Sequence, residues 1–405
     1  MIAAKRAASA AILRNHEKII DISHRIHAEP ELGHEEHRAS ALLTEELHGA
    51  GLEVHLGVCE LATAFTATIG SGDLHVALCA EYDALPGIGH ACGHNMIAAA
   101  AVGAAIALAP IADDLRLRVT VIGTPAEEVL ERGGKVLLLE RGAFDGVHAA
   151  MMIHPAPFEL ATPALIAATK FQVEFQGRAS HASAAPELGV NAADAAVISQ
   201  VALGLLRQQL PGEARVHGIF DTAGLAPNVI PAAAHGSYMV RVPAFEDLKQ
   251  LKDRVMNCFR AGALASGCEL RLSGGDKAYR DVIHDPGLAA QYQQNAEQLG
   301  RNFRTEREAE TFTASTDMGN VSALIPSIHP FVRVCAWPTA NHQPEFTAAC
   351  VTQEADDTVL DAAMALAGTV IDLAHDEARR QSLIAHASAQ PAVSARAREA
   401  AGAFS

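Results

Sequence analysis

The sequence predicts an α/β protein of two domains, the second inserted into the first. At 405 residues the chain is longer than one hydrophobic core usually holds, since domains typically contain about 50–250 residues. Apolar strand-like runs alternate with helical segments over residues 1–165, as expected of a mainly parallel sheet. The middle of the chain instead follows the order β-α-β-β-α-β, and the earlier alternation returns after it.

The first domain is expected to comprise residues 1–167 and 277–375. Its helices are predicted near 5–28, 35–50, 94–109, 131–141, 286–300 and 347–374, and its strands near 62–69, 74–80, 116–123, 147–153 and 331–336. The uncharged run 96–112 is rich in Ala and Gly and is shorter than the roughly 20 residues of a membrane span. We therefore expect it to form a buried helix.

The inserted domain is expected over residues 168–276, where the β-α-β-β-α-β order defines a ferredoxin-like unit. Its first strand is KFQVEFQG, and the helix NAADAAVISQVALGLLRQQL carries apolar residues at helical spacing. Residues 376–405 are Ala-rich and polar without a strong apolar period. They are expected to form a weakly packed C-terminal tail.

Net charge, the N-terminal segment and the cysteines indicate which partners and which cellular compartment to expect. The formal net charge of −16 disfavours binding to nucleic acid or to an anionic membrane. The N-terminal segment soon becomes charged and lacks an apolar core followed by a cleavage site, so it predicts an amphipathic helix and not a signal peptide. Seven cysteines without paired spacing suit a reducing, cytoplasmic environment, where a thiol stays free to bind metal.

Candidate metal ligands follow four strand-like runs. They are Cys92 and His94 after the run at 74–80, Glu127 and Glu128 after the run at 116–123, His154 at the end of VHAAMMIHP, and His342 after the run at 331–336. Active sites of open α/β sheets gather at the carboxyl ends of strands, so these side chains are expected to converge. Because Cys, His and Glu together suit a divalent transition metal, the pattern predicts a metal-dependent enzyme, most simply a hydrolase.

Each motif taken alone also has a structural interpretation. The pair Cys92 and His94 is typical of a buried loop, and an isolated His154 or His342 fits a core or loop histidine equally well. Adjacent glutamates suit the first turn of a helix, although they repel each other unless a cation lies nearby. A metal supplies that cation, so that one carboxylate ligates it and the other takes a proton from its bound water. The metal hypothesis depends on the combination of motifs.

Three polar residues of the inserted domain are candidates for contact with substrate. His181 lies in the small-residue loop GRASHAS, Asn228 lies in APNVIP, and Arg241 lies in the strand YMVRVP. Arg241 is either a surface position of the sheet or a guanidinium fork for a substrate carboxylate.

These motifs together resemble the aminoacylase and auxin-conjugate amidohydrolase branch of the M20 metallopeptidase family. The resemblance covers about residues 15–375 and rests on HRIHAEPELGHEE, EYDALPGIGHACGHN, GTPAEE followed by GGK, MMIHP, GRASHAS, NVIP and STDMGNVS. Among subgroups, the chain is most similar to aminobenzoyl-glutamate hydrolases and β-alanyl-lysine-type dipeptidases. The fold that this implies is a zinc-peptidase-like α/β catalytic domain with a lid domain that dimerises.

The resemblance also implies a role for each candidate residue. The metal ligands are Cys92, His94, Glu128, His154 and His342. Glu127 is the general base, His181 reaches a neighbouring subunit's site to hold the oxyanion, and Asn228 and Arg241 hold the substrate. Where many relatives have a His-x-Asp element, this chain has Glu81-Tyr82-Asp83, and Cys92 takes the bridging position of an Asp. One or two divalent ions are therefore expected, with zinc first and manganese as the alternative.

The function expected from these residues is metal-dependent hydrolysis of the amide bond in N-acyl amino acids or small dipeptides. Glu127 would activate a metal-bound water, and the enzyme would act on its small-molecule substrate as a homodimer through the lid. One alternative is a thiol hydrolase with Cys92 as nucleophile and His94 as base. The other is a binding protein with a degenerate site, which the presence of Glu127 argues against.

Overall fold

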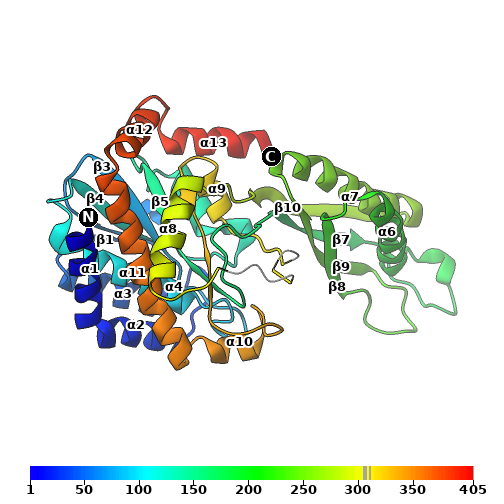
Figure 1. Ribbon diagram of the computed structural model, residues 1–405. Coiled ribbons are helices and arrows are strands. Elements are labelled where there is room, and N and C mark those ends of the chain that lie inside the picture. The colour runs from blue at the N-terminus through cyan, green and yellow to red at the C-terminus, as the bar shows by residue number, and fades with distance from the viewer. Residues whose placement is uncertain (304–307, 310–311, 405) are drawn as a thin grey trace. The chain divides into compact units, whose positions relative to one another are not determined.

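The computed structural model describes residues 1–303, 308–309 and 312–404, which separate into two compact units (Figure 1). Unit 1 contains Met1–Ala164 and Val282–Ala400. Unit 2 contains Leu165–Asp281 together with the chain from Ala401 onward. Unit 2 is therefore inserted between two segments of unit 1, and the last residues of the chain also belong to unit 2.

Within the described residues, the main sheet of unit 1 has six strands in the order β1-β2-β4-β3-β5-β11. They are β1 (Glu53–Leu56), β2 (Phe65–Ile69), β3 (Leu74–Ala80), β4 (Leu117–Gly123), β5 (Ala149–Met151) and β11 (Ser327–Ile328). Strands β4, β3, β5 and β11 are parallel, whereas β1 and β2 add an antiparallel edge. The sheet is thus mixed. The apolar sequence of β3 follows from its burial along the whole strand.

Helices surround this sheet. They are α1 (Ile2–Arg14), α2 (His16–Ala28), α3 (His37–Gly49), α4 (His94–Leu108), α5 (Gly134–Glu140), α8 (Pro286–Gln298), α9 (Met318–Ser322), α10 (Pro344–Ala349) and α11 (Gln353–His375). The helix predicted over 5–28 is in fact two helices, because the backbone turns at Asn15, whose side chain donates to the Ala11 carbonyl. The helical segment His94–Ile111, which contains α4, and helix α11 are long and apolar enough to cross a membrane by length and composition, but most of each is buried within the protein. They are core helices of unit 1, and α4 packs directly on β3.

The residues after 375 form two helices rather than the weakly packed tail that the sequence predicts. These are α12 (Glu377–Ser388) and α13 (Val393–Phe404). Arg380 is buried, pairs with Asp73 and donates to the Leu115 carbonyl at 3.0 Å, while Leu383 enters the core. Alanine-rich helices carry few large side chains, so the sequence shows little apolar period although a buried cation and a leucine anchor the segment.

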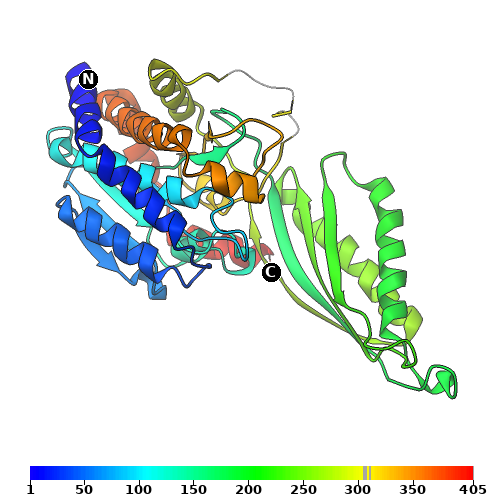
Figure 2. The ribbon, with the colours of Figure 1, turned by 90° about the horizontal axis from the view of Figure 1, so that it is seen from below.

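Unit 2 has the β-α-β-β-α-β order that the sequence predicts. Its elements are β7 (Ala167–Gln176), α6 (Ala192–Leu206), β8 (Arg215–Thr222), β9 (Ala233–Val242), α7 (Phe245–Ser266) and β10 (Glu269–Tyr279). In the described part of this unit, four antiparallel strands lie in the order β10-β7-β9-β8, and both helices form a layer on one face (Figure 2). Residues of β9 alternate between buried and half-exposed, as expected for a sheet covered on one side.

Candidate metal centre and active site

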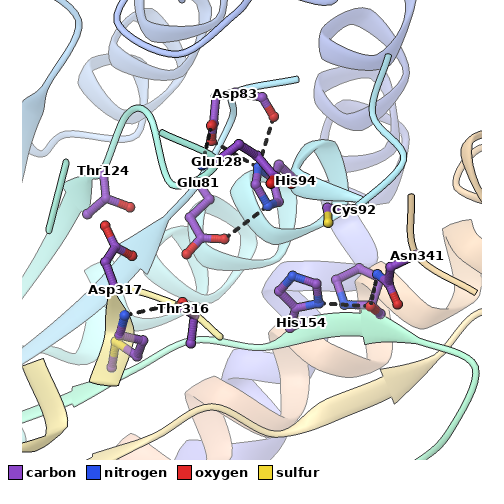
Figure 3. Close-up of polar contacts among 12 residues, drawn as sticks. Glu81, Asp83, Cys92, His94, Thr124, Glu128, His154, Thr316, Asp317 and Asn341 are labelled. Carbon is purple, nitrogen blue, oxygen red and sulfur yellow. Dashed lines mark hydrogen bonds and ion pairs between the residues drawn. The ribbon is translucent and has the colours of Figure 1, made fainter. Parts of the chain in front are cut away.

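Loops that follow the carboxyl ends of β3 and β4 meet at one place in unit 1 (Figure 3). There they are joined by β6 (His154–Ala156) and by the loop before α10. Four overlapping groups of potential ligand atoms, each within 4.8 Å of one another, lie among the described residues. The groups are Cys92–His94–His154, Cys92–Glu128–His342, His94–Glu127–Glu128 and Glu81–Glu127–Asp317. The thiol of Cys92 belongs to two groups and therefore lies between two sets of side chains.

His342 is brought to this centre from the distant C-terminal part of unit 1. Its Nε2 lies 3.0 Å from Sγ of Cys92 and 3.5 Å from Oε1 of Glu128. Its backbone N–H donates to the Ala91 carbonyl at 2.9 Å, and its φ of 67° is uncommon for a residue other than glycine. The neighbouring Asn341 donates from its side chain to the Pro155 carbonyl at 3.1 Å. The loop is thus tied to two other parts of the site.

His94 presents one nitrogen to the centre because the other is already bonded (Figure 3). Nδ1 donates to the carbonyl of Asp83 at 2.8 Å and to its carboxylate at 2.9 Å. This arrangement places the proton on Nδ1 and leaves the lone pair of Nε2 for a metal. The second carboxylate oxygen of Asp83 accepts the backbone N–H of Glu128 at 3.0 Å. Asp83 therefore orients two of the predicted ligands.

His154 is oriented in the same manner. It lies on β6, which pairs with β12 (Phe331–Arg333) in a small parallel sheet. Nδ1 lies 2.8 Å from the Pro155 carbonyl and so carries the proton, which leaves the lone pair on Nε2. The rings of His154 and His94 meet edge to face, with centroids 5.9 Å apart.

The donor atoms suit a divalent metal. Nε2 of His94 and Oε1 of Glu128 are buried without a hydrogen-bond partner in the described part of the chain. Each such buried polar atom costs roughly 1–3 kcal/mol unless something satisfies it. Imidazole, thiolate and carboxylate side chains are the usual ligands of zinc and its neighbours in the periodic table. The observed side chains therefore fit the group that they were predicted to bind.

The two adjacent glutamates differ in their electrostatics. Burial raises the pKa of Glu127 well above its usual range, and the charges of Glu81 and Glu128 add to this effect. Burial also acts on Glu128, but the contact of its carboxylate with His342 and the charge of His94 outweigh it and lower the pKa of Glu128. Neighbouring carboxyl groups whose pKa values are pushed apart commonly divide the tasks of holding charge and moving a proton.

Residues 77–367, which include every residue of this centre, match the model of peptidase family M20/M25/M40. The chain belongs to this family. It is a metal-dependent hydrolase of the peptidase and amidohydrolase type, as the motifs predicted.

Relatives of this M20 enzyme include several hydrolases. The Xaa-Arg dipeptidase of Mus musculus is 39% identical over 387 residues, covering 91% of this chain and 88% of that protein. One subunit of the p-aminobenzoyl-glutamate hydrolase of Escherichia coli (strain K12) is 33% identical over 275 residues, covering 63% of this chain and 57% of that protein. Among solved structures, a dinuclear metal-binding M20 peptidase from Bacillus subtilis aligns with a TM-score of 0.65 and 22% identity, covering 88% of this chain and 98% of that one. That likeness establishes the shared fold.

The surroundings of Cys92 disfavour the thiol-nucleophile alternative for this M20 enzyme. Burial, together with the neighbouring charges of Glu128 and Glu127, raises the pKa of the Cys92 thiol well above its usual value. A reactive cysteine needs the opposite environment, in which positive charge stabilises the thiolate. The imidazole of His94 donates a hydrogen bond to Asp83 and shares one ligand group with Cys92, so its geometry suits metal binding better than the role of a base.

The residues predicted in unit 2 fall into two places. His181 and Asn228 lie on adjoining exposed loops, where the Ala182 N–H donates to the Asn228 carbonyl at 3.0 Å. Nδ1 of His181 accepts the backbone N–H of Ala184 at 3.2 Å, which leaves the proton on Nε2. Arg241 lies near the far end of β9, about 26 Å from the start of that strand at ~3.3 Å per residue. His181 follows the end of β7, where Gln176 pairs with Ala233 at the start of β9, so one copy of unit 2 does not bring Arg241 and His181 together.

Four residues of the centre had no role assigned from the sequence. Asp83 orients His94, while Lys135 donates to the carboxylates of Glu81 and Asp317. Glu81 and Asp83 stood out only as a departure from the family element, and Lys135 and Asp317 only as parts of the markers GGK and STDMGNVS. Neither marker follows a long apolar strand, which is the signal that pointed to the other candidate ligands.

Proposed function

We propose that this M20 enzyme hydrolyses the amide bond of N-acyl amino acids or small dipeptides. The observation that carries the proposal is the convergence of five potential ligand side chains with the Glu127 carboxylate. The names of two relatives support the substrate class, since one is a dipeptidase and the other a hydrolase of p-aminobenzoyl-glutamate.

Five side chains of unit 1 would hold the metal: Cys92, His94, Glu128, His154 and His342. Because Cys92 belongs to two ligand groups, these side chains would hold one or two ions. Zinc is the first choice because thiolate and imidazole suit it, and manganese is the alternative. When bound, the metal polarises the scissile carbonyl and makes water at the site more acidic.

Glu127 would move the proton during the reaction. Its carboxylate accepts a proton from the attacking water and later delivers it to the leaving amine. His181 donates from Nε2 to the oxyanion of the tetrahedral intermediate, a contact worth ~3–4 kcal/mol in comparable sites. Arg241 binds the carboxylate of the released amino acid, with Asn228 as a second substrate contact. Unit 2 serves as a lid that opens for product release.

A homodimer through unit 2 would reconcile these roles. A dipeptide spans only about 7 Å, so it cannot touch both ends of β9 in one copy. We therefore assign His181 and the adjoining Asn228 to the active site of a partner subunit. Unit 2 offers an edge strand, β8, and an apolar row of Val197, Val201 and Leu205 on α6, each more than half exposed. These surfaces suit an interface with a second copy.

A cytoplasmic location fits the cysteine chemistry. All seven cysteines lie in the described residues and are free thiols. A reducing compartment would keep Cys92 available to a metal.

The test is amide hydrolysis on a panel of dipeptides and N-acyl amino acids, before and after chelation. Loss of activity on removal of metal and recovery with added zinc or manganese would identify both the metal and the substrate class. Activity that persists in metal-free protein, verified by elemental analysis, would reject the mechanism. The variant His342→Ala should lose both metal and activity.

A further inference from the structure

Lys135 lies inside the carboxylate cluster beside the metal centre. Its side chain is completely buried in the first turn of α5. Nζ donates to Oε1 of Glu81 and, at 2.5 Å, to Oδ1 of Asp317. The backbone N–H of Lys135 donates to the other oxygen of Asp317 at 2.9 Å. Both carboxylates are themselves fully buried, so the ammonium group is held from two sides in a region without solvent.

The backbone holds Lys135 in this position. An added Cβ at Gly134 would lie 1.9 Å from the carbonyl oxygen of Pro125, so only glycine permits this approach. Pro125 belongs to the loop that carries Glu127. The start of α5 is therefore packed directly against the loop of the proposed general base, and Lys135 follows immediately.

The cluster around Lys135 has the geometry of a metal site. Glu81, Glu127 and Asp317 each offer an oxygen within 4.8 Å of the others. Three buried carboxylates at this distance repel one another unless a cation lies among them. The ammonium of Lys135 contacts Glu81 and Asp317, and thus supplies positive charge where a divalent ion would otherwise be needed.

Lys135 also determines which way Glu81 points. Because Oε1 of Glu81 accepts from Lys135, Oε2 is directed to the other side, where it lies 3.4 Å from Nε2 of His94. Oε2 is buried and has no hydrogen-bond partner among the described residues. Oε2 of Glu81 and the lone-pair nitrogen of His94 therefore face each other as two acceptors, while the other oxygen of the carboxylate is held by the ammonium.

We propose that the ammonium group of Lys135 occupies the position in the Glu81–Glu127–Asp317 cluster that a metal ion would otherwise take. Lys135 thereby keeps metal ions out of this cluster. It also positions Glu81 toward the metal bound by His94. The inference rests on the proposed function, since it takes His94 as a metal ligand. Lys135 is a positioning residue in this proposal. Its charge stands in for a metal ion, so the number of ions bound per chain is set partly by a lysine.

The test is the zinc content of purified protein after equilibration with zinc chloride and gel filtration. Lys135→Ala removes the cation and opens space, so this variant should hold one more ion per chain than the wild type. The double variant Lys135→Ala with Asp317→Asn should return to the wild-type content, because it lacks one of the three carboxylates. A folded Lys135→Ala variant with unchanged zinc content would overturn the proposal.

Asp317→Asn alone keeps the proposal testable if the lysine variants do not fold. Wild-type zinc content is expected, because Asp317 binds Lys135 and not metal. Loss of one ion per chain would show that Asp317 is a ligand and would overturn the proposal. Failure of the proposed function gives a different result, in which Cys92→Ala and His342→Ala retain their full zinc content whatever the behaviour of Lys135.

Discussion

At the scale of single residues, the pKa values of the adjacent residues Glu127 and Glu128 shift in opposite directions, upward for Glu127 and downward for Glu128. We predict that Glu127→Gln lowers kcat by about 10²–10⁴-fold, because the amide keeps the shape of the side chain but cannot accept a proton. Its zinc content should stay at the wild-type level. The matched variant Glu128→Gln should instead lose zinc. The kcat and the zinc content are measured on the same preparation of each variant. Near-normal turnover by Glu127→Gln would refute the role of Glu127 as the base.

Glu36 is a buried carboxyl group beneath the loop that carries Glu127. It accepts the Ala126 N–H at 2.8 Å and the Thr63 hydroxyl at 2.7 Å. Burial, together with the charge of Asp83, raises the pKa of Glu36 from 4.5 to about 7. The folded protein therefore binds this proton more tightly than the unfolded chain. The corresponding stabilisation is complete below pH 4.5 and is lost as the pH rises through 7.

The variant Glu36→Gln should remove this pH dependence. Relative to the wild type, its free energy of unfolding should rise between pH 4.5 and pH 7, by an amount on the order of 3 kcal/mol at most. Urea unfolding of both metal-free proteins across this range gives the difference directly. A difference that does not change with pH would mean that Glu36 titrates normally in the folded protein.

At the scale of elements, the start of α4 depends on glycine at position 93. Gly93 has a φ of 73°, and an added Cβ would lie 2.7 Å from Cγ of Pro155. Gly87, in the same loop, has a φ of 78° but open space around it. We predict that Gly87→Ala costs about 1 kcal/mol of stability through its φ alone. Gly93→Ala should cost about 1–3 kcal/mol more through crowding.

Gly93→Ala should also weaken zinc binding, since Cys92 and His94 flank the substituted residue. Urea unfolding and competition with a chelator measure the two effects separately. If both alanine variants had the same stability and zinc affinity, contact between this turn and β6 would not matter for the centre.

At the scale of the whole molecule, the dimer proposal predicts complementation between two inactive proteins. His181→Ala keeps its metal centre but lacks the donor, whereas Glu127→Gln keeps the donor. Co-expression of the two variants should restore about a quarter of wild-type activity, because half of the dimers are mixed and each has one complete site. Activity is compared with each variant expressed alone. No recovery in verified mixed dimers would place His181 at its own subunit's site, or at none.

Much of this architecture could be read from the chain because it follows local patterns. Buried strands such as β3 are continuous apolar runs, and the helix and strand periods of unit 2 alternate in the order β-α-β-β-α-β. The family motifs then led to the peptidase and amidohydrolase class. Patterns of this kind depend on residues close together in sequence, so no tertiary information was needed.

What the sequence alone determined was therefore the elements, the family and the side chains that follow its strands. Only the tertiary structure decided how those side chains are held. Lys135 meets a carboxylate 54 residues before it and another 182 residues after it, and Arg380 meets Asp73 across 307 residues. Such contacts leave no periodic signal, because they depend on how distant loops and helices pack. For the same reason, the contacts of the Lys135 ammonium with Glu81 and Asp317 were found only in the tertiary structure.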